Sequence, residues 1–275
     1  MQEQAIDLFG TSVSEIGDTN IDGRADFLAG APLFDGAAGA NAGKAYAFSG
    51  LDASELFSME GEAAGDEMGR RVANVPDLDG DGIEDLAFAA PLHDGPAGID
   101  SGRVYIFSGA TGTLIRVLDG AAAGANFGRS LSGIEDVNGD GDGDLIVGAV
   151  GSATIFSGAD GSVLLALSGG PAFGRAVSRL GDVNADGIPD LVVGDADLAT
   201  AHSSDTGAVL ESFFLLDKAL SGADLGAAVS DVGDVNGDGK DDVLVGAPGH
   251  CGFTPPACGG AAFVFSVPAS GFIPF

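Results

Sequence analysis

The sequence predicts an all-β fold, a β-propeller of five four-stranded blades. Three observations lead to it: an acidic loop recurs five times, short apolar segments separated by turn residues surround every copy, and no stretch has a helical period long enough to compete. Glycine supplies 47 of the 275 residues without the three-residue period of collagen, which indicates many turns between short strands.

The repeat is defined by the starting points of the acidic loops. They begin at Asp18, Asp77, Asp136, Asp182 and Asp234, so the intervals are 59, 59, 46 and 52 residues. Four strand-like segments repeated about every 50 residues are typical of propeller blades, of which a ring holds about four to eight. The chain contains no Trp, which argues against the WD type of blade. We therefore divide a single domain, 1–275, into units at about 7–65, 66–124, 125–171, 172–222 and 223–275.

Every unit has the same order of elements. A Phe-Gly pair or a relative precedes the acidic loop, at Phe9-Gly10, Met68-Gly69, Phe127-Gly128, Phe173-Gly174 and Leu225-Gly226. An apolar run after the loop ends in Gly-Ala-Pro or a variant, at 30–32, 89–91, 148–150, 194–196 and 246–248. A third segment, Tyr-Ala-Phe-Ser at 46–49, recurs in variants at 105–108, 154–157, 200–203 and 263–266, and a fourth follows a turn, as at 114–118. The last unit ends near 272–275, so we expect closure by packing between blades one and five.

The acidic loops have the composition of calcium sites. Oxygen-bearing side chains occupy the first, third, fifth and ninth positions of all five loops, and glycine always holds the sixth. Calcium takes six to eight oxygen ligands at about 2.3–2.6 Å, and the glycine permits the sharp turn that brings in the seventh carbonyl; magnesium demands a stricter octahedron. We expect about five Ca²⁺, one per repeat, with a structural role, because the clustered carboxylates would otherwise repel one another.

The expected ligands follow from these positions. The side-chain ligands are Asp18, Asn20, Asp22, Asp26, Asp77, Asp79, Asp81, Asp85, Asp136, Asn138, Asp140, Asp144, Asp182, Asn184, Asp186, Asp190, Asp234, Asn236, Asp238 and Asp242. The seventh-position ligands, through their carbonyls, are Arg24, Ile83, Asp142, Ile188 and Lys240.

The closest alternative for these loops is the EF-hand, whose loop ends in a bidentate Glu at the twelfth position. That position is apolar in every copy here: Ala29, Phe88, Val147, Val193 and Val245. Ordinary surface turns rich in Asp and Gly would not place four ligands in phase five times. The EF-hand interpretation therefore fails.

The combination of Phe-Gly, calcium loop and Gly-Ala-Pro resembles the FG-GAP repeat of integrin α-subunit propellers and their bacterial relatives. The resemblance covers nearly the whole chain, and it implies calcium in the hairpin between strands one and two of each blade. It departs from the family in number, because integrin propellers have seven blades and this chain carries five repeats. The chain is either a complete five-bladed propeller or a fragment lacking two copies. Since the repeats fill the sequence from end to end, we expect a closed ring of five blades.

The face opposite the calcium loops is the expected recognition surface. In a four-stranded meander the loops between strands two and three share that face, and they are long in blades one, two and five, at about 33–43, 92–102 and 249–260. In a closed ring these three blades would be neighbours and their loops would form one raised crescent. Long loops on a rigid scaffold commonly carry binding.

Six residues on that face are candidates for ligand contact. Phe34, His93 and His250 occupy matching positions two residues after the Pro. Arg70, Arg129 and Arg175 follow the Gly of the Phe-Gly motif, and we expect them to ring the mouth of the central channel and attract a carboxylate or sulfate. The alternatives are pairing with local carboxylates for the arginines and ordinary surface positions for the two loop histidines. His202 replaces a Phe of the other copies, which favours a packed substitution.

Charge and cysteine usage limit the compartment and the partners. The 41 acidic residues stand against 11 basic ones, and the net charge of −30 argues against nucleic acid and against an anionic membrane. No apolar run approaches the roughly 18 residues of a membrane helix, and no signal peptide is visible. Cys251 and Cys258 flank a short loop, and a disulfide there would favour an oxidising, extracellular setting; free thiols or part of a metal site are the alternatives.

These features predict an extracellular calcium-binding module, secreted or at the cell surface, that serves in recognition or adhesion by binding a protein or a glycan and is not an enzyme. One alternative is an extracellular enzyme acting on a polysaccharide, which a cluster of His93, His250 and a carboxylate would favour. Another is a purely architectural module of a larger surface protein. A flat crescent bearing aromatic side chains would favour recognition.

Overall fold

The computed structural model describes residues 7–214, 223–250 and 259–267 of the chain. Within these ranges the regular structure consists of β-strands alone, in five separate antiparallel sheets. Four sheets have four strands and the last has three. The propeller blades expected from the repeats are therefore present, and no helix in the described ranges is long and apolar enough to cross a membrane.

Each sheet is a meander, in which strands that follow one another along the chain are paired. Blade one holds β1 (Ser12–Ile16), β2 (Asp26–Ala31), β3 (Lys44–Phe48) and β4 (Glu55–Glu60). Blade two holds β5 (Arg71–Val75), β6 (Asp85–Ala90), β7 (Arg103–Phe107) and β8 (Leu114–Asp119). Blade three holds β9 (Ser130–Ile134), β10 (Asp144–Ala149), β11 (Ser152–Ser157) and β12 (Val163–Ser168). Blade four holds β13 (Ala176–Leu180), β14 (Asp190–Asp195), β15 (Leu198–His202) and β16 (Val209–Phe213), and blade five holds β17 (Ala228–Asp231), β18 (Val243–Ala247) and β19 (Ala261–Phe265).

The core lies between the blades, which explains the continuous apolar runs in the second strands. In β6, Leu86 packs into the core shared with blade one, whereas its neighbour Ala87 packs into the core shared with blade three. In β14, Leu191 and Val192 divide in the same way between blades three and five. Because side chains alternate across a strand, a sheet covered on both faces needs apolar residues at every position.

The Phe-Gly and Gly-Ala-Pro motifs meet at one end of every blade. The amide of the Phe-Gly glycine donates to the carbonyl of the first Gly-Ala-Pro residue, as in Gly128 to Gly148 at 3.1 Å. The Gly-Ala-Pro glycine in turn lies against the next blade: a Cβ on Gly148 would come within 2.2 Å of the carbonyl oxygen of Gly174. The two motifs therefore set the contact between successive blades. In blades one, three and four a glycine allows the two backbones to touch, whereas blade two carries Ala89 at this position.

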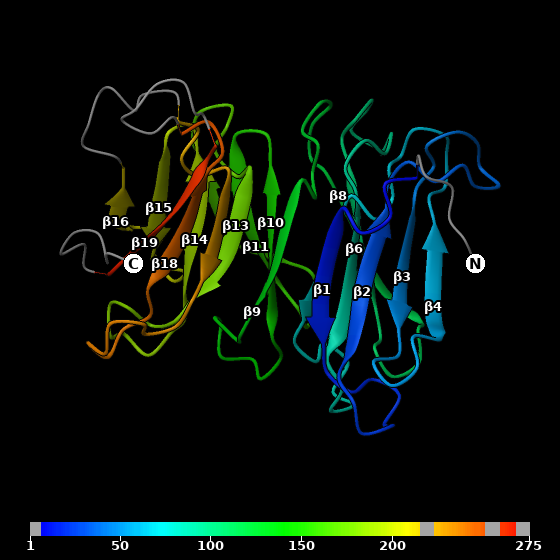
Figure 1. Ribbon diagram of the computed structural model, residues 1–275, viewed down its shortest axis with the longest axis horizontal. Helices are drawn as coiled ribbons and strands as arrows, with labels where there is room; N and C mark the ends of the chain where they lie inside the picture. Colours follow the sequence, from blue (N-terminus) through cyan, green and yellow to red (C-terminus); the bar gives the residue numbers. More distant parts are fainter. Residues whose placement is uncertain (1–6, 215–222, 251–258, 268–275) are drawn as a thin grey trace.

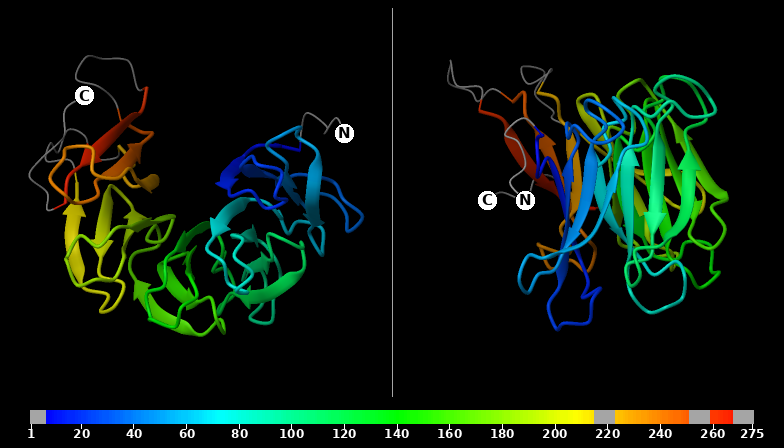
Figure 2. Two further views of the ribbon diagram at one scale, coloured as in Figure 1. Left: turned by 90° about the horizontal axis from the view of Figure 1, so that it is seen from below. Right: turned by 90° about the vertical axis from the view of Figure 1, so that its right-hand side faces the viewer.

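The expected closed ring of five blades is not observed. Figure 2 shows blade one and blade five at opposite ends of an open arc, and no strand pairing joins them in the described ranges. The innermost strands β1, β5, β9, β13 and β17 follow one another along the arc, and they line an axial cavity of about 770 Å³. Each interface fixes the rotation from one blade to the next, and the four rotations between the five blades leave the arc open.

The open arc also separates the blades that were expected to carry the crescent. Blades one and two remain neighbours, but blade five lies at the far end of the arc, so the three blades are not adjacent as the crescent required (Figures 1 and 2). The expected fourth strand of the last unit, near 272–275, lies outside the described residues, as does the Cys251–Cys258 loop.

Candidate metal loops and the opposite face

All five acidic loops join the first strand of a blade to the second, at the end of the blades away from the Phe-Gly motifs (Figure 1). The residue at the first position organises each loop. In the second loop, Asp77 Oδ2 accepts the amide of Gly82 at 2.7 Å, while Asp77 Oδ1 accepts the amide of Asp81 at 3.2 Å. The bond from the sixth-position amide recurs in the other four loops at 2.7–2.8 Å.

The sixth position is a place where only glycine fits easily. Its φ lies between 85° and 100° in all five loops, which is the left-handed region that other L-residues rarely adopt. The turn directs the third- and fifth-position side chains back into the loop: Asp79 Oδ1 accepts the Asp81 amide at 3.2 Å, and Asp81 Oδ1 accepts the Ile83 amide at 2.8 Å. The sequence pattern of alternating oxygens thus becomes a compact loop with its carboxylates on the inside.

The ninth-position aspartate is buried in every loop. Its side chain is at most 2% exposed in each copy: Asp26, Asp85, Asp144, Asp190 and Asp242. One carboxylate oxygen accepts the amide of the second loop residue at 2.8–3.0 Å in all five. In the first three blades the other oxygen accepts, at 3.0 Å, the amide of the glycine that follows the third strand. This aspartate therefore ties the loop to the body of its own blade.

In the second to fifth loops, burial makes the ninth-position carboxylate hard to ionise without a cation. It raises the pKa of Asp85, Asp144 and Asp190 to about 6, with a smaller contribution from the acidic neighbours in the same loop, and it also raises the pKa of Asp242. Within the described residues, no Lys or Arg forms an ion pair with any of the ninth-position aspartates. Each loop thus contains a buried acid that lacks a counter-charge from the protein.

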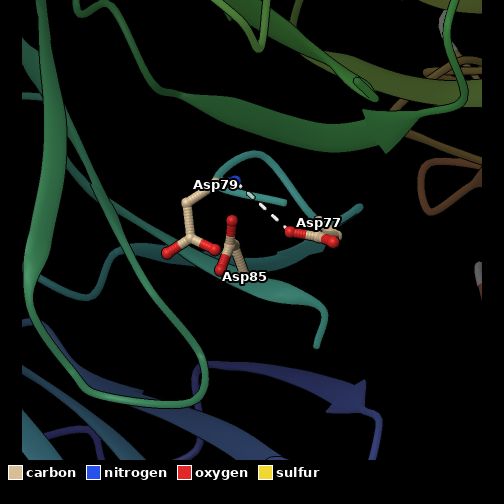
Figure 3. A group of neighbouring side chains, drawn as sticks. All are labelled: Asp77, Asp79 and Asp85. Carbon is tan, nitrogen blue, oxygen red and sulfur yellow. Dashed lines mark hydrogen bonds between the residues drawn. The ribbon is translucent and has the colours of Figure 1, made fainter. Parts of the chain in front are cut away.

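The donor set of the second loop fits a hard divalent cation. Asp77, Asp79 and Asp85 each place one carboxylate oxygen within 4.8 Å of the other two (Figure 3). Ligands of one calcium ion, bonded at about 2.3–2.6 Å, can lie at most about 5 Å apart, so one ion could reach all three oxygens. The other four loops have Asn at the third position, so an amide oxygen replaces one carboxylate there.

On the opposite face, the structure places Phe34, His93 and His250 at equivalent turn positions. Each donates its amide, at 3.1 Å, to the carbonyl of the last residue in the preceding strand. Their surroundings differ: Phe34 lies beneath the Lys44 ammonium, and His250 lies edge-on to Phe263.

The structure does not bring the two loop histidines together, because they belong to blades two and five. His93 is only 7% exposed, and its Nδ1 lies 3.1 Å from Asp66 Oδ2. Since Asp66 belongs to the segment between blades one and two, the His93–Asp66 contact links neighbouring blades. His202 is buried as a Phe would be, with Nε2 2.8 Å from Thr200 Oγ1, and burial lowers its pKa.

The three predicted arginines lie together. Arg70, Arg129 and Arg175 line one cavity of about 370 Å³, together with Arg71, which was not among the predicted ligand residues. Arg71 lies one position beyond the motif position that the other three share, and its signal in the sequence is the pair of consecutive arginines in so acidic a chain. The local-pairing alternative holds for two of them, because Arg70 pairs with Glu67 at 2.7 Å and Arg175 pairs with Asp224 through both of its terminal nitrogens.

Comparison with known proteins agrees with the repeat pattern. The FG-GAP repeat family matches residues 68–107 and 227–252. The chain is 36% identical to mouse integrin alpha-IIb over 167 residues, 38% identical to human integrin alpha-IIb over 165 residues and 36% identical to Xenopus laevis integrin alpha-5 over 168 residues. These alignments cover 54–56% of this chain but only 15–16% of the relatives, so the chain corresponds to about a sixth of their length.

Two solved structures share the fold at lower identity. The V. cholerae biofilm matrix protein Bap1 superposes with a TM-score of 0.53 at 22% identity, covering 94% of this chain and 37% of that one. Saccharomyces cerevisiae Sqt1 superposes with a TM-score of 0.58 at 13% identity, covering 90% of this chain and 57% of that one. The repeated motifs, the five meander sheets and the 36–38% identity to these integrin alpha chains together support an integrin-like FG-GAP propeller.

Proposed function

We propose that this propeller is a calcium-stabilised recognition module, extracellular and either secreted or at the cell surface, which binds a protein or a glycan on the face opposite its acidic loops. The observation that carries the proposal is that the two faces of the propeller carry different kinds of loop and side chain. One face holds five loops built alike around a buried acid, and the other holds the long loops of blades one and two and a cavity lined by arginines.

The calcium loops are proposed to be structural because of what their residues touch. The first-position aspartate holds the loop backbone, and the ninth-position aspartate holds the loop against the third strand of the same blade. When bound, the ion supplies positive charge to a buried carboxylate that has no partner cation in the described residues. About five ions, one for each repeat, would bring ten positive charges to the sixteen carboxylates at the predicted side-chain ligand positions.

The ligand face offers hydrogen-bonding groups rather than a catalytic arrangement. The enzyme alternative required His93, His250 and a carboxylate in one place, and the structure puts the two histidines in different blades. The His93–Asp66 pair is buried and joins blades one and two, which is a structural contact. Recognition is therefore the function that the geometry supports best.

An array experiment tests this proposal. The calcium-loaded protein would be applied to arrays of glycans and of extracellular proteins, in parallel with protein stripped by EDTA. We expect ligand binding that is retained in calcium and reduced after stripping, because the loops across the blade stiffen the scaffold that carries the ligand face. Absence of binding on both arrays would count against recognition and in favour of a purely architectural module.

A further inference from the structure

The arginine cavity has a charge balance unlike the rest of the molecule. The chain has 11 basic residues against 41 acidic ones, yet four of the 11 line this single cavity of about 370 Å³. Among its described lining residues, Glu67 is the one acid. The cavity lies where the inner strands of blades two, three and four begin, on the face opposite the metal loops.

The four arginines differ in what neutralises them. Arg70 and Arg175 are paired with Glu67 and Asp224. Arg129, in contrast, donates only to the carbonyl of Pro171, at 3.4 Å, and Arg71 donates only to the carbonyl of Arg70, at 3.1 Å, within the described part of the chain. Neither of these two guanidinium groups lies against a carboxylate there.

Arg71 and Arg129 are also partly buried and close to other cations. Burial lowers the pKa of each, and the neighbouring arginines lower it further: Arg70 acts on Arg71, and Arg175 and Arg71 act on Arg129. A guanidinium nevertheless remains charged in proteins, because its ordinary pKa lies above about 12. Two half-buried like charges without a counter-ion are unfavourable unless an anion from outside completes the site.

We propose that Arg71 and Arg129 form an anion site that takes the carboxylate of an acidic sugar, such as a uronic acid residue of a polysaccharide. The planar fork of a guanidinium matches a carboxylate with two parallel hydrogen bonds, and two such forks here have that capacity free. This inference rests on the proposed recognition function, since it names the ligand class for the same face.

Groups around the two arginines favour a sugar over an acidic peptide. The Asn126 amide donates to the Pro91 carbonyl at 3.4 Å, and its Oδ1 accepts no hydrogen bond from the described residues. Glu67 uses Oε2 for Arg70. Asn126 Oδ1 and Glu67 Oε1 are therefore acceptors for hydroxyl groups, which a uronate carries beside its carboxylate and an aspartate or glutamate side chain does not.

The net charge of the chain does not prevent such binding. At physiological ionic strength the screening length is about 8 Å, so distant carboxylates act weakly on a ligand that contacts the arginines directly. Surface charge elsewhere would slow the approach of an anionic chain more than it would weaken the complex.

The test is calorimetric titration of the calcium-loaded protein with a hyaluronan tetrasaccharide, whose carboxyl-reduced form is the neutral control and tetraglutamate the peptide control. We expect the acidic sugar to bind and the neutral form not to bind measurably. Arg71→Gln and Arg129→Gln should each weaken binding at least tenfold, and Arg129→Lys should weaken it less, because the charge remains and the fork is lost. Thermal melts would confirm that each variant is folded.

Arg116→Gln is the matched control. It removes the same charge from a partly buried arginine of β8, outside the cavity and the metal loops, where the guanidinium donates to the carbonyls of Gly158 and Ala159, so it should alter affinity by less than twofold. Three outcomes would overturn the inference: no binding of the acidic sugar at millimolar concentration, equal affinity in the arginine variants, or tighter binding of tetraglutamate than of the sugar. If the arrays described above still show a ligand in any of these cases, the recognition function stands and only the sugar site fails.

Discussion

Replacing the buried aspartate of the second loop, Asp85→Asn, should change stability in opposite directions with and without calcium. Asp85 is completely buried, and Asp77 and Asp79 each bring a carboxylate oxygen within 4.8 Å of its own. In the absence of calcium, burial raises its pKa from 3.8 to about 6. At pH 7.5, above both values, ionisation in the folded state therefore costs about 3 kcal/mol of stability.

The asparagine removes that charge but introduces a mismatch. The Asp85 carboxylate accepts the amides of Leu78 at 2.8 Å and of Gly109 at 3.0 Å, and an asparagine can accept only one of them. A buried group left without its hydrogen bond costs about 1–3 kcal/mol. In EDTA the variant should therefore equal the wild type or exceed it by up to about 2 kcal/mol.

In calcium, the wild type should be more stable than the Asp85→Asn variant. At a hundredfold excess over the dissociation constant, one site contributes about 2.7 kcal/mol to the wild type, and the variant loses this contribution. The variant should then be less stable than the wild type by about 1–3 kcal/mol. Urea unfolding in calcium and in EDTA measures both differences in stability. Far-ultraviolet circular dichroism is the probe, because the chain has no Trp for fluorescence.

Asp52→Asn is the control for charge alone. Asp52 is exposed, accepts the Ser54 amide at 2.9 Å and lies outside the metal loops, so its substitution should have the same effect in calcium and in EDTA. The reasoning would be refuted by an Asp85→Asn variant that is destabilised equally in both arms, since the carboxylate would then serve only its two backbone hydrogen bonds.

Three further outcomes are expected. Stripping calcium from the wild type should lower its melting temperature substantially, and an unchanged melt would show that the loops fold without metal. Burial lowers the pKa of His202 from its ordinary value of 6.5, so protonation of His202 destabilises the fold as pH falls through that value. When urea unfolding is measured at pH 7.5 and at pH 5.5, the wild type should therefore lose more free energy of unfolding than the His202→Phe variant. Equal losses would contradict this reasoning. Gly148→Ala should destabilise the protein by about 1–3 kcal/mol, because the added Cβ would meet Ser130 Oγ at 2.0 Å. Gly246→Ala should cost little, because the atom nearest to a Cβ there is 3.4 Å away. Equal costs would indicate a further blade packed on blade five.

The strand content and the loops could be read from the sequence because local rules govern them. A glycine at the sixth loop position is needed for a backbone φ near 90°, and acids at alternate positions of a tight turn converge whatever surrounds them. Likewise, apolar runs such as 86–90 are required of any strand covered on both faces. These features repeat five times, so each copy supports the interpretation of the others.

The arrangement of the blades could not be read in this way. Whether five units close depends on the rotation at each interface, which is set by many contacts between blades, such as the close approach of Gly148 to the Gly174 backbone. A closed ring was expected because the repeats fill the chain, and the crescent of three loops depended on a closed ring. Both expectations failed together, because blade five lies at the far end of the arc.

The arginine cavity, too, could be predicted from the sequence only in part. The sequence determined that arginines recur after the Phe-Gly glycine, but only the tertiary structure decided which arginines of the cavity lack a carboxylate partner among the described residues. Glu67 and Asp224 satisfy Arg70 and Arg175, and the fold leaves Arg71 and Arg129 side by side across the interface of blades two and three. Spacing along the chain fixes which groups recur, whereas the balance of charges in a cavity depends on residues that meet only after the blades have packed.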